Sequence, residues 1–255
     1  MKKNRKTILI TGASKRIGAG IAKILAKNNF NLIIHYNKSK KEAEKLCSQL
    51  NSKEEIAFAV DGNLMIDKEV KDIIYKAQKK VGDIFCLINN ASTFEYDNLE
   101  TFNNSFWKKH LIANLKAPMN LSKYYSKSLS KNYRGNIINI IDQRVLNLTP
   151  HFLSYTISKS GLWTLTKTLA LHLAPRIKVN AIGPGPALKS KFQTNKQFEA
   201  QCKKMPLGIG TNPEEIGKTI LFLISSSSIT GQMIVLDGGQ HLGWGQVKKT
   251  SIIRD

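Results

Sequence analysis

Long apolar runs, paired cysteines and acidic residues are what this sequence of 255 residues has least of. No apolar run approaches the roughly 20 residues that a membrane-spanning helix needs. The basic start leads straight into a strand-like segment, without the apolar core and cleavage site of a secretory leader. The three cysteines, Cys47, Cys86 and Cys202, are odd in number and lack CxxC or His–Cys metal spacing, which is typical of a reducing compartment. We therefore expect a cytoplasmic protein with no membrane partner and no metal site.

Acidic residues are outnumbered by basic ones, 18 against 39, so the formal net charge is +21. Such a charge is compatible with a nucleic-acid partner or an anionic ligand. However, only six of the basic residues are Arg, the lysines are spread over nearly every segment, and no recognisable nucleic-acid-binding module is present. We interpret the charge as a solvated surface that attracts anionic cofactors and substrates in general, with no nucleic-acid partner.

Short apolar runs alternate with amphipathic segments along the whole chain. The runs span residues 7–11, 31–36, 56–60, 84–89, 136–141, 177–182 and 232–236, and helical patterns between them include 17–28, 40–50, 67–80 and 156–174. Helices of this length supply the crossovers that parallel strands need. The pattern predicts an α/β fold: one doubly wound Rossmann-type domain over residues 1–255, with a seven-stranded parallel sheet. The polar segment 186–205 interrupts the alternation and is a predicted substrate lid.

A glycine-bearing turn joins the first apolar run to the helical pattern that follows it. It reads Thr11-Gly12-Ala13-Ser14-Lys15-Arg16-Ile17-Gly18. The N-terminus of a helix presents free N–H groups and the positive end of its dipole, which together bind a pyrophosphate. The spacing is not GxGxxG, and a glycine turn alone also begins ordinary helices. Its place between a strand and a helix favours a dinucleotide site.

The end of the second apolar run lacks the acid that usually holds the adenosine ribose of NAD. It reads His35-Tyr36-Asn37-Lys38-Ser39. A carboxylate there would repel a 2′-phosphate, whereas Lys38, Ser39 and Arg16 offer cations and a hydroxyl that bind one. The sequence therefore predicts NADPH as the cofactor, in preference to NADH.

Three tyrosines are followed by a lysine four residues later, in the pairs Tyr36–Lys40, Tyr75–Lys79 and Tyr155–Lys159. With 33 lysines in the chain, this spacing arises readily by chance, and we interpret the first two pairs as structural. Only Tyr155–Lys159 follows the fifth run with a helix ahead, where i,i+4 spacing puts both side chains on one face at the ligand-binding edge. A neighbouring ammonium favours the phenolate and so eases proton donation. Tyr155 is the predicted proton donor, and Lys159 the residue that tunes it.

Together these motifs resemble the short-chain dehydrogenase/reductase family, from Thr11 to the LDGG of Leu236–Gly239. The turn is close to the family's TGxxxGxG, and the NNAS of Asn89–Ser92 is close to its Asn-Asn-Ala-Gly. The resemblance implies that Asn114 is the remaining catalytic position, where it anchors a proton-relay water. It leaves open whether Asp61 or Asn63 contacts the adenine. It implies cofactor contacts at Gly12, Ser14, Arg16, Ile17, Gly18, His35, Tyr36, Lys38, Ser39, Asn63, Leu64, Asn90, Ala91, Ser92, Tyr155, Lys159, Pro184 and Gly185.

Within the family, several departures resemble the pteridine reductases and the bacterial dihydromonapterin and dihydrofolate reductases related to them. Arg16 stands in place of the middle glycine of the turn, HYNKS follows the second run, and Asp142 occupies the position of the usual catalytic Ser. In NNASTF, the resemblance implies that Ser92 and Phe94 hold a pterin, with Phe94 stacking it against the nicotinamide. The implied substrate contacts are Arg16, Ser92, Phe94, Asp142 and Tyr155.

Asp142 places a carboxyl group at the mouth of an apolar strand. A ketone reductase needs only a hydroxyl there to hold a carbonyl oxygen, but a pterin ring nitrogen must gain a proton as hydride arrives at the adjacent carbon. A carboxyl that holds its proton part of the time can donate to Tyr155 or orient the ring nitrogen. Asp142 therefore favours reduction of a pterin C=N bond.

Three functions compete on this sequence. The first is NADPH-dependent reduction of a pterin, either a dihydropterin such as dihydromonapterin or dihydrofolate. A 3-oxoacyl or other carbonyl reductase of the same family would normally carry Ser at position 142, and a non-catalytic NADP-binding regulator would not need the Tyr155–Lys159 pair. Segment 186–205 reads the distal side chain of a pterin in such enzymes, so the sequence does not rank the pterins. The family is commonly tetrameric, which makes a homotetramer the expected assembly. The tail 245–255 has no counterpart in the family.

Overall fold

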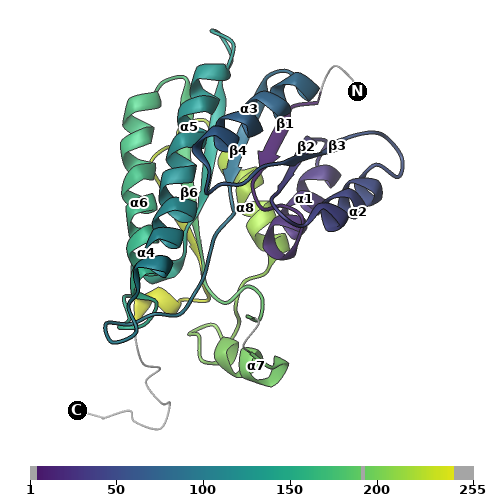
Figure 1. The fold of residues 1–255 in the computed structure, drawn as a ribbon. Helices are drawn as coiled ribbons and strands as arrows, with labels where there is room; N and C mark the ends of the chain where they lie inside the picture. The colour runs from purple at the N-terminus through teal and green to yellow at the C-terminus, as the bar shows by residue number, and fades with distance from the viewer. Residues whose placement is uncertain (1–4, 191–192, 244–255) are drawn as a thin grey trace, which may run out of the picture.

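A seven-stranded parallel sheet forms the centre of the computed structural model, which describes residues 5–190 and 193–243. The strand order is β3-β2-β1-β4-β5-β6-β7, and Figure 1 shows the strands running toward the same edge. The strands are β1 (Thr7–Ile10), β2 (Asn31–Tyr36), β3 (Ala57–Asp61), β4 (Ile84–Asn89), β5 (Gly135–Ile140), β6 (Ile177–Pro184) and β7 (Met233–Leu236). The predicted fold class and strand number are confirmed.

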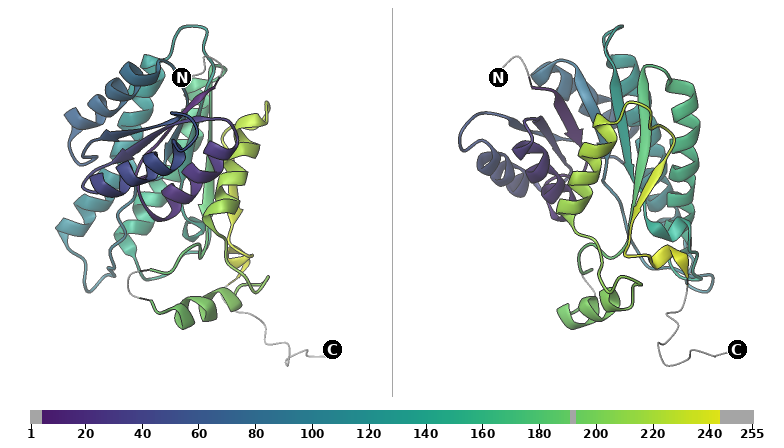
Figure 2. Two further views of the ribbon diagram at one scale, coloured as in Figure 1. Left: turned by 90° about the vertical axis from the view of Figure 1, so that its right-hand side faces the viewer. Right: turned by 180° about the vertical axis from the view of Figure 1, so that it is seen from behind.

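Helices cover both faces of the sheet (Figures 1 and 2). One face carries α1 (Arg16–Lys27), α2 (Lys40–Leu50) and α8 (Pro213–Ser225), and the other carries α3 (Asp67–Val81), α4 (Asn104–Leu111), α5 (Ala117–Ser128) and α6 (Leu153–Leu173). Helix α7 (Asn195–Lys203) belongs to the predicted lid and lies beyond the carboxyl ends of the strands. This is the edge at which open α/β sheets bind ligands.

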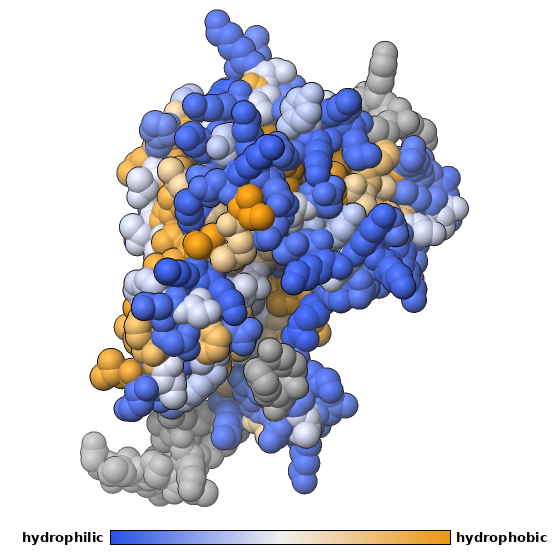
Figure 3. Space-filling view, viewed as in Figure 1, coloured by the Kyte–Doolittle hydropathy of each residue, from blue (hydrophilic) through white to orange (hydrophobic). Residues whose placement is uncertain are grey.

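The surface is largely hydrophilic on the face drawn in Figure 3, as the high charge of the chain leads one to expect. More of its scattered apolar side chains lie over α4, α5 and α6 than over α1, α2 and α3. Within the described residues, no helix has the length and hydropathy needed to cross a bilayer. The tail 244–255, for which the sequence made no structural prediction, lies outside the described residues.

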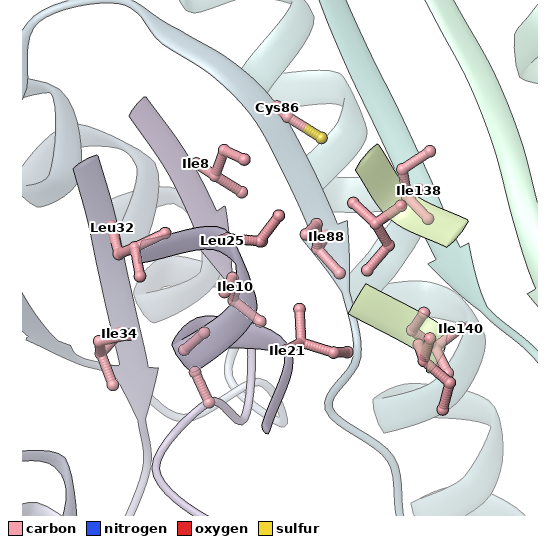
Figure 4. Packing of buried hydrophobic residues seen from close by; sticks show 14 of the residues in the cluster. Ile8, Ile10, Ile21, Leu25, Leu32, Ile34, Cys86, Ile88, Ile138 and Ile140 are labelled. Carbon is pink, nitrogen blue, oxygen red and sulfur yellow. The ribbon is translucent and has the colours of Figure 1, made fainter. Parts of the chain in front are cut away.

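The core consists of two apolar layers, one on each side of the sheet. Ile8 and Ile10 of β1 point to the α1 side together with Leu25, as Figure 4 shows, while Leu9 points to the α3 and α5 side. Because both faces are covered, most residues of the six strands β1 to β6 are buried, and apolar residues predominate in them. Fully burying one such side chain contributes about 1.5–3 kcal/mol, and this packing holds the carboxyl ends of the strands in register beneath the site.

Candidate active site

The glycine turn between β1 and α1 is packed too closely for side chains at two positions. Gly12 has φ +60°, and a Cβ there would meet Ala91 Cα at 3.0 Å. A Cβ on Gly18 would lie 2.5 Å from the Gly12 carbonyl oxygen. The side-chain amide of Asn90 donates to the carbonyls of Thr11 and Gly12, at 2.9 and 3.1 Å. The backbone at the start of α1 is therefore fixed and bare, as a cradle for a pyrophosphate requires.

His35 lies beneath this turn and not in the pocket. Its side chain is 1% exposed, its Nδ1 accepts from the Gly12 N–H at 3.1 Å, and its Nε2 lies 3.0 Å from the Gly62 carbonyl. Because Nδ1 is an acceptor, we assign the proton to Nε2. Burial lowers the pKa of His35 to about 4. The predicted cofactor residue is thus a neutral side chain that supports the Gly12 backbone from below and does not line the pocket.

The corner at the ends of β2 and β3 carries the predicted adenosine contacts. The Asn37 side chain donates to Asn63 Oδ1 at 3.4 Å, which places Asn63 beside the acid-free end of β2. Asp61 is held by Lys76 at 2.9 Å, and this ion pair lowers the pKa of Asp61. Leu64 is 8% exposed and packs into the core. Of the two residues left open by the sequence, Asn63 is therefore the better placed to contact adenine.

A cation that the sequence argument missed lies close to this corner. Lys15 lines the pocket and forms an ion pair with Glu42 of α2 at 2.6 Å. Its position in the turn, next to Arg16, was a sequence signal that could have found it. Lys15 adds a second cation to the part of the site expected to hold a 2′-phosphate.

Tyr155 and Asp142 meet at the carboxyl end of β5. Tyr155 Oη donates to Asp142 Oδ2 at 3.0 Å, and Asp142 Oδ1 accepts from the backbone N–H of Arg144 at 2.8 Å. Lys159, one turn along α6, donates from Nζ to the Ile140 carbonyl at 2.9 Å. The structure thus brings together the tyrosine, lysine and acid selected from the sequence. The other two pairs lie elsewhere, with Tyr75 exposed on α3.

The pKa of Tyr155 is raised well above its usual value, first by burial and then by the charge and hydrogen bond of Asp142. The sequence argument expected Lys159 to ease proton loss from Tyr155, so the direction found here is the opposite. The reason is that the burial of Tyr155 and its hydrogen bond to Asp142 both favour the neutral phenol. Lys159 is itself buried, 2% exposed, and burial lowers its pKa to about 8 although Asp142 opposes the shift. Before the reaction, the phenol proton therefore stays on Tyr155, which donates it in the hydrogen bond to Asp142.

Asn114 lies in a π-helical turn, η1 (Ile112–Lys116), which joins α4 to α5. Its Oδ1 accepts from Ser92 Oγ at 3.1 Å and from the Thr93 N–H at 2.8 Å. Its Nδ2 donates to the Thr93 carbonyl at 3.0 Å and to Ser158 Oγ at 3.1 Å. Such turns occur frequently at functional sites. The side chain of Asn114 thus fixes Ser92 and Thr93 against α6, and its amide is used by these protein partners.

An aromatic wall borders Tyr155. The Phe94 ring stacks on Phe152, with centroids 4.4 Å apart and an interplanar angle of 11°, and meets the Tyr155 ring edge-on at 4.7 Å. Phe94 is 39% exposed and lines the pocket. A flat heterocycle fits beside such a wall because offset stacking favours ring on ring.

Arg16 reaches from the glycine turn to the lid. It has φ 52°, in the region that favours the glycine of the usual motif, and its guanidinium donates to the Lys189 carbonyl at 2.8 Å. Within the lid, Gln193 donates to the Gln201 side chain at 2.8 Å. This hydrogen bond from Arg16 connects the lid to the cofactor turn across the pocket.

The pocket between the turn, β5 and the lid has a volume of about 500 Å³. Predicted residues that line it are Gly12, Arg16, Ile17, Gly18, Asn90, Ala91, Ser92, Phe94, Asp142, Tyr155 and Gly185. Lys159 and Asn114 support it from behind, Ser14 lies on the turn and Pro184 ends β6, while Tyr36, Lys38, Ser39, Asn63 and Leu64 belong to the adjoining corner. The described residues contain no cluster of metal ligands.

Other lining residues were missed by the sequence argument. Gln143 and Arg144 directly follow Asp142, so their place after β5 was a usable signal. Nothing in the spacing of the lid residues pointed to the pocket. The lid and the last turn contribute Gln193, Phe198, Gln201 and Gln240.

Comparison with known proteins agrees with this geometry. Residues 12–241 match the sequence profile of the family described as Enoyl-(Acyl carrier protein) reductase. The chain is 30% identical over 242 residues to the 3-oxoacyl-(acyl-carrier-protein) reductase FabG of Staphylococcus epidermidis, covering 93% of this chain and 99% of that protein. It is 27% identical over 248 residues to glucose 1-dehydrogenase 2 of Bacillus subtilis, covering 93% and 95%.

Two solved structures are more similar in sequence. FolM alternative dihydrofolate reductase 1 from Brucella canis, complexed with NADP, has a TM-score of 0.91 and 41% identity, covering 96% of this chain and 97% of that chain. The protein of the same name from Brucella suis, in complex with NADP, has a TM-score of 0.91 and 42% identity, covering 97% and 99%. The chain therefore belongs to the short-chain dehydrogenase/reductase family of oxidoreductases, in the branch of pteridine reductases and alternative dihydrofolate reductases.

Proposed function

We propose that this enzyme reduces a C=N bond in the ring of a pterin, either a dihydropterin or dihydrofolate, with NADPH. The observation that carries the proposal is the hydrogen bond of 3.0 Å between Tyr155 and Asp142, in a pocket bordered by the Phe94 ring. A carbonyl substrate does not need an acid at this position. A ring nitrogen that must be protonated does.

NADPH is the cofactor of the enzyme, and the residues of the pocket fit it. The bare turn at Gly12 and Gly18 admits a pyrophosphate, and the end of β2 has no carboxylate to repel a 2′-phosphate. Lys15 and Arg16 line the pocket beside it. When bound, the dihydronicotinamide supplies the hydride. The two Brucella structures with NADP support the same assignment.

Reduction of a C=N bond takes a hydride at carbon and a proton at nitrogen, and the chain must deliver the proton. While Asp142 is ionised, its charge holds the proton on Tyr155. Protonation of Asp142 removes that charge and supplies a second proton beside Tyr155 Oη, so Tyr155 can release its own proton to the ring nitrogen and recover one from Asp142. The ammonium of Lys159, on the next turn of α6, stabilises the negative charge that passes along this pair.

An assay can distinguish the proposed pterin reduction from two alternative functions. The likeness to the Staphylococcus epidermidis protein named 3-oxoacyl-(acyl-carrier-protein) reductase supports an acyl thioester substrate. Two features argue against an acyl thioester substrate: residue 142 is Asp and not a residue with a hydroxyl group, and Phe94 offers a flat ring surface. A non-catalytic regulator has no need of the Tyr155–Asp142 hydrogen bond.

The test is NADPH oxidation by the purified enzyme with dihydrofolate, dihydromonapterin, biopterin and an acetoacetyl thioester, each at saturating NADPH. The proposal predicts a higher kcat/KM for at least one pterin than for the thioester. The relative values also rank the pterins, whose distal side chains would meet Gln193 and Gln201 of the lid. Turnover of the thioester without turnover of any pterin would contradict the proposal.

A further inference from the structure

A buried chain of polar side chains lies behind Tyr155. His110 of α4, Ser154 of α6 and Asp97 of the segment between β4 and α4 are each 0% exposed. His110 Nδ1 lies 2.7 Å from Ser154 Oγ, and Ser154 Oγ donates to Asp97 Oδ2 at 2.5 Å. At the other end, His110 Nε2 accepts from the backbone N–H of Glu95 at 3.1 Å. Three segments that are separate in sequence are thus connected through one imidazole ring.

The hydrogen bonds of this chain have one direction. Because Nε2 accepts from an N–H group, the imidazole proton is on Nδ1 and is donated to Ser154, whose hydroxyl is donated to Asp97. Burial lowers the pKa of His110; the charges of Asp97 and Glu95 oppose this shift, and those of Lys159 and Lys109 add to it. The ring is therefore neutral, with each nitrogen used once.

Asp97 also replaces the missing cap of α6. Phe152, at the N-cap position, has left-handed backbone angles, and its side chain makes no capping hydrogen bond. Instead, the Asp97 carbonyl accepts from the N–H groups of Phe152 at 2.7 Å and Leu153 at 3.3 Å, and its carboxylate accepts from the Ser154 N–H at 3.2 Å. A carboxylate at a helix N-terminus is stabilising. The next residue in the helix is Tyr155.

The same chain reaches both groups that the proposed reaction needs to align. Glu95, held by His110, is adjacent to Phe94, and Ser154, held by His110 and Asp97, is adjacent to Tyr155. The His110 ring also contacts the Tyr155 ring, with centroids 5.8 Å apart and an interplanar angle of 74°. The Phe94 ring meets the same Tyr155 ring edge-on, with centroids 4.7 Å apart. Loss of either hydrogen bond, the one to Glu95 or the one to Ser154, would shift Phe94 and Tyr155 relative to each other.

We infer that His110 is a positioning residue that sets the Phe94 wall and the Tyr155 hydroxyl relative to each other, through two separable hydrogen bonds. The bond to Glu95 places Phe94 and so governs substrate binding. The bond to Ser154, continued to Asp97, places Tyr155 and so governs proton transfer. The kinetic part of this inference rests on the proposed pterin reduction.

Two substitutions separate the bonds. In His110→Gln, the carboxamide reaches the position of Nε2 and can accept from Glu95, but the bond to Ser154 is lost. In His110→Asn, the carboxamide reaches the position of Nδ1 and can donate to Ser154, but the bond to Glu95 is lost. Both variants lose the same ring contact with Tyr155, so each is the matched control of the other. Ser154→Ala cuts the bond to α6 independently and leaves the imidazole in place.

The expected result is a crossed pattern. His110→Asn should raise the pterin KM about fivefold to tenfold with kcat nearly unchanged, the scale of one lost hydrogen bond. His110→Gln and Ser154→Ala should lower kcat by about the same factor with KM nearly unchanged. The Kd of NADPH should stay constant in all three. Parallel changes in kcat and KM across the variants, accompanying a lower melting temperature, would show a merely structural role and overturn the inference.

A measurement that needs no substrate separates this inference from the proposed function. Hydrogen exchange of the Glu95 amide in the NADPH-bound protein should be faster in His110→Asn than in the wild type and His110→Gln, while amides of β4 and β5 keep their protection. An unchanged rate at Glu95 in His110→Asn would overturn the inference even if pterins are reduced. If the wild type reduces no pterin but the exchange pattern holds, the proposed function alone fails.

Discussion

Asp142 carries the chemical argument at the scale of single residues. Its carboxylate accepts a hydrogen bond from the Tyr155 hydroxyl at 3.0 Å, and among the described residues it is the one acid that lines the pocket. Asp142→Asn and Asp142→Ser should both fold and bind NADPH but lose about 10²-fold or more of pterin turnover, the usual scale for a general acid. Steady-state kinetics and an NADPH fluorescence titration on the same preparations measure both effects. Full pterin turnover by the Ser variant would reduce Asp142 to a turn residue.

Phe94 should contribute to substrate binding and not to cofactor binding. Its ring lies against Phe152 and Tyr155, and stacking of a pterin on it would add about 0.5–1.5 kcal/mol beyond area burial. Phe94→Ala should therefore raise the pterin KM several-fold and leave the Kd of NADPH nearly intact. Equal losses in both constants would mean that Phe94 supports the fold and does not contact substrate.

Lys159 should make the enzyme less stable and more active at neutral pH. Its pKa of about 8 lies below the ordinary 10.5, so between these values the unfolded state binds more protons and stability rises with pH. Below pH 8 the buried charge lowers the free energy of unfolding by roughly 3 kcal/mol. Lys159→Met removes this cost but also loses the hydrogen bond to Ile140, which is worth roughly 1 kcal/mol. Urea unfolding without cofactor should show the variant more stable at pH 7. As pH approaches 10.5 the charge cost in the wild type disappears, so the difference should pass through zero and the variant should become less stable by roughly the 1 kcal/mol of the lost hydrogen bond.

The same lysine predicts the pH dependence of the wild-type rate. The ammonium of Lys159 is lost as pH rises through about 8, and with it the positive charge beside the Tyr155–Asp142 pair. Pterin turnover at saturating NADPH should therefore fall as pH rises through this range. A rate that is flat from pH 7 to 9.5 would argue against a role for these groups in proton delivery.

At the scale of secondary-structure elements, the alternation of apolar runs with helices was enough to predict the sheet. The bounds of β2 and β4 agree with the sequence to the residue, because their apolar runs end abruptly at polar residues. Helix α6 begins at Leu153, before the predicted 156, because Asp97 caps it from a distant segment. The π-turn at Asn114 and the burial that reverses the pKa shift of Tyr155 likewise depend on tertiary contacts, which no local pattern contains.

Arg16, the first residue of α1, makes the hydrogen bond that connects the cofactor turn to the lid. Changing Arg16 to Gly removes its hydrogen bond to Lys189 and the charge-assisted contact that we propose it makes with the 2′-phosphate, worth roughly 1.5–3 kcal/mol. The ratio of kcat/KM with NADPH to that with NADH should fall about tenfold or more. Lys189→Ala is the matched control, because it keeps the backbone carbonyl. An unchanged ratio in Arg16→Gly would remove Arg16 from the cofactor site.

At the scale of the whole molecule, we propose a homotetramer. Leu171 is 84% exposed on α6, and Met119 and Ile157 are each 41% exposed on α5 and α6. Light scattering should give about four times the chain mass of 28.5 kDa. Leu171→Lys should lower this mass, whereas Leu99→Lys, at an equally exposed position (82%) outside the helices, should not. A monomeric wild type would contradict the proposal.

In the proposed reaction, hydride reaches a pterin ring carbon in this pocket. The most direct measurement uses NADPH deuterated at both C4 positions and determines the reduced product by mass spectrometry and NMR. We expect one deuterium per product molecule, bonded to the ring carbon next to the newly protonated nitrogen, and about 10²-fold slower formation of that product by Asp142→Ser. A deuterium found only at the carbinol carbon of a reduced acyl thioester, with none in any pterin, would contradict it.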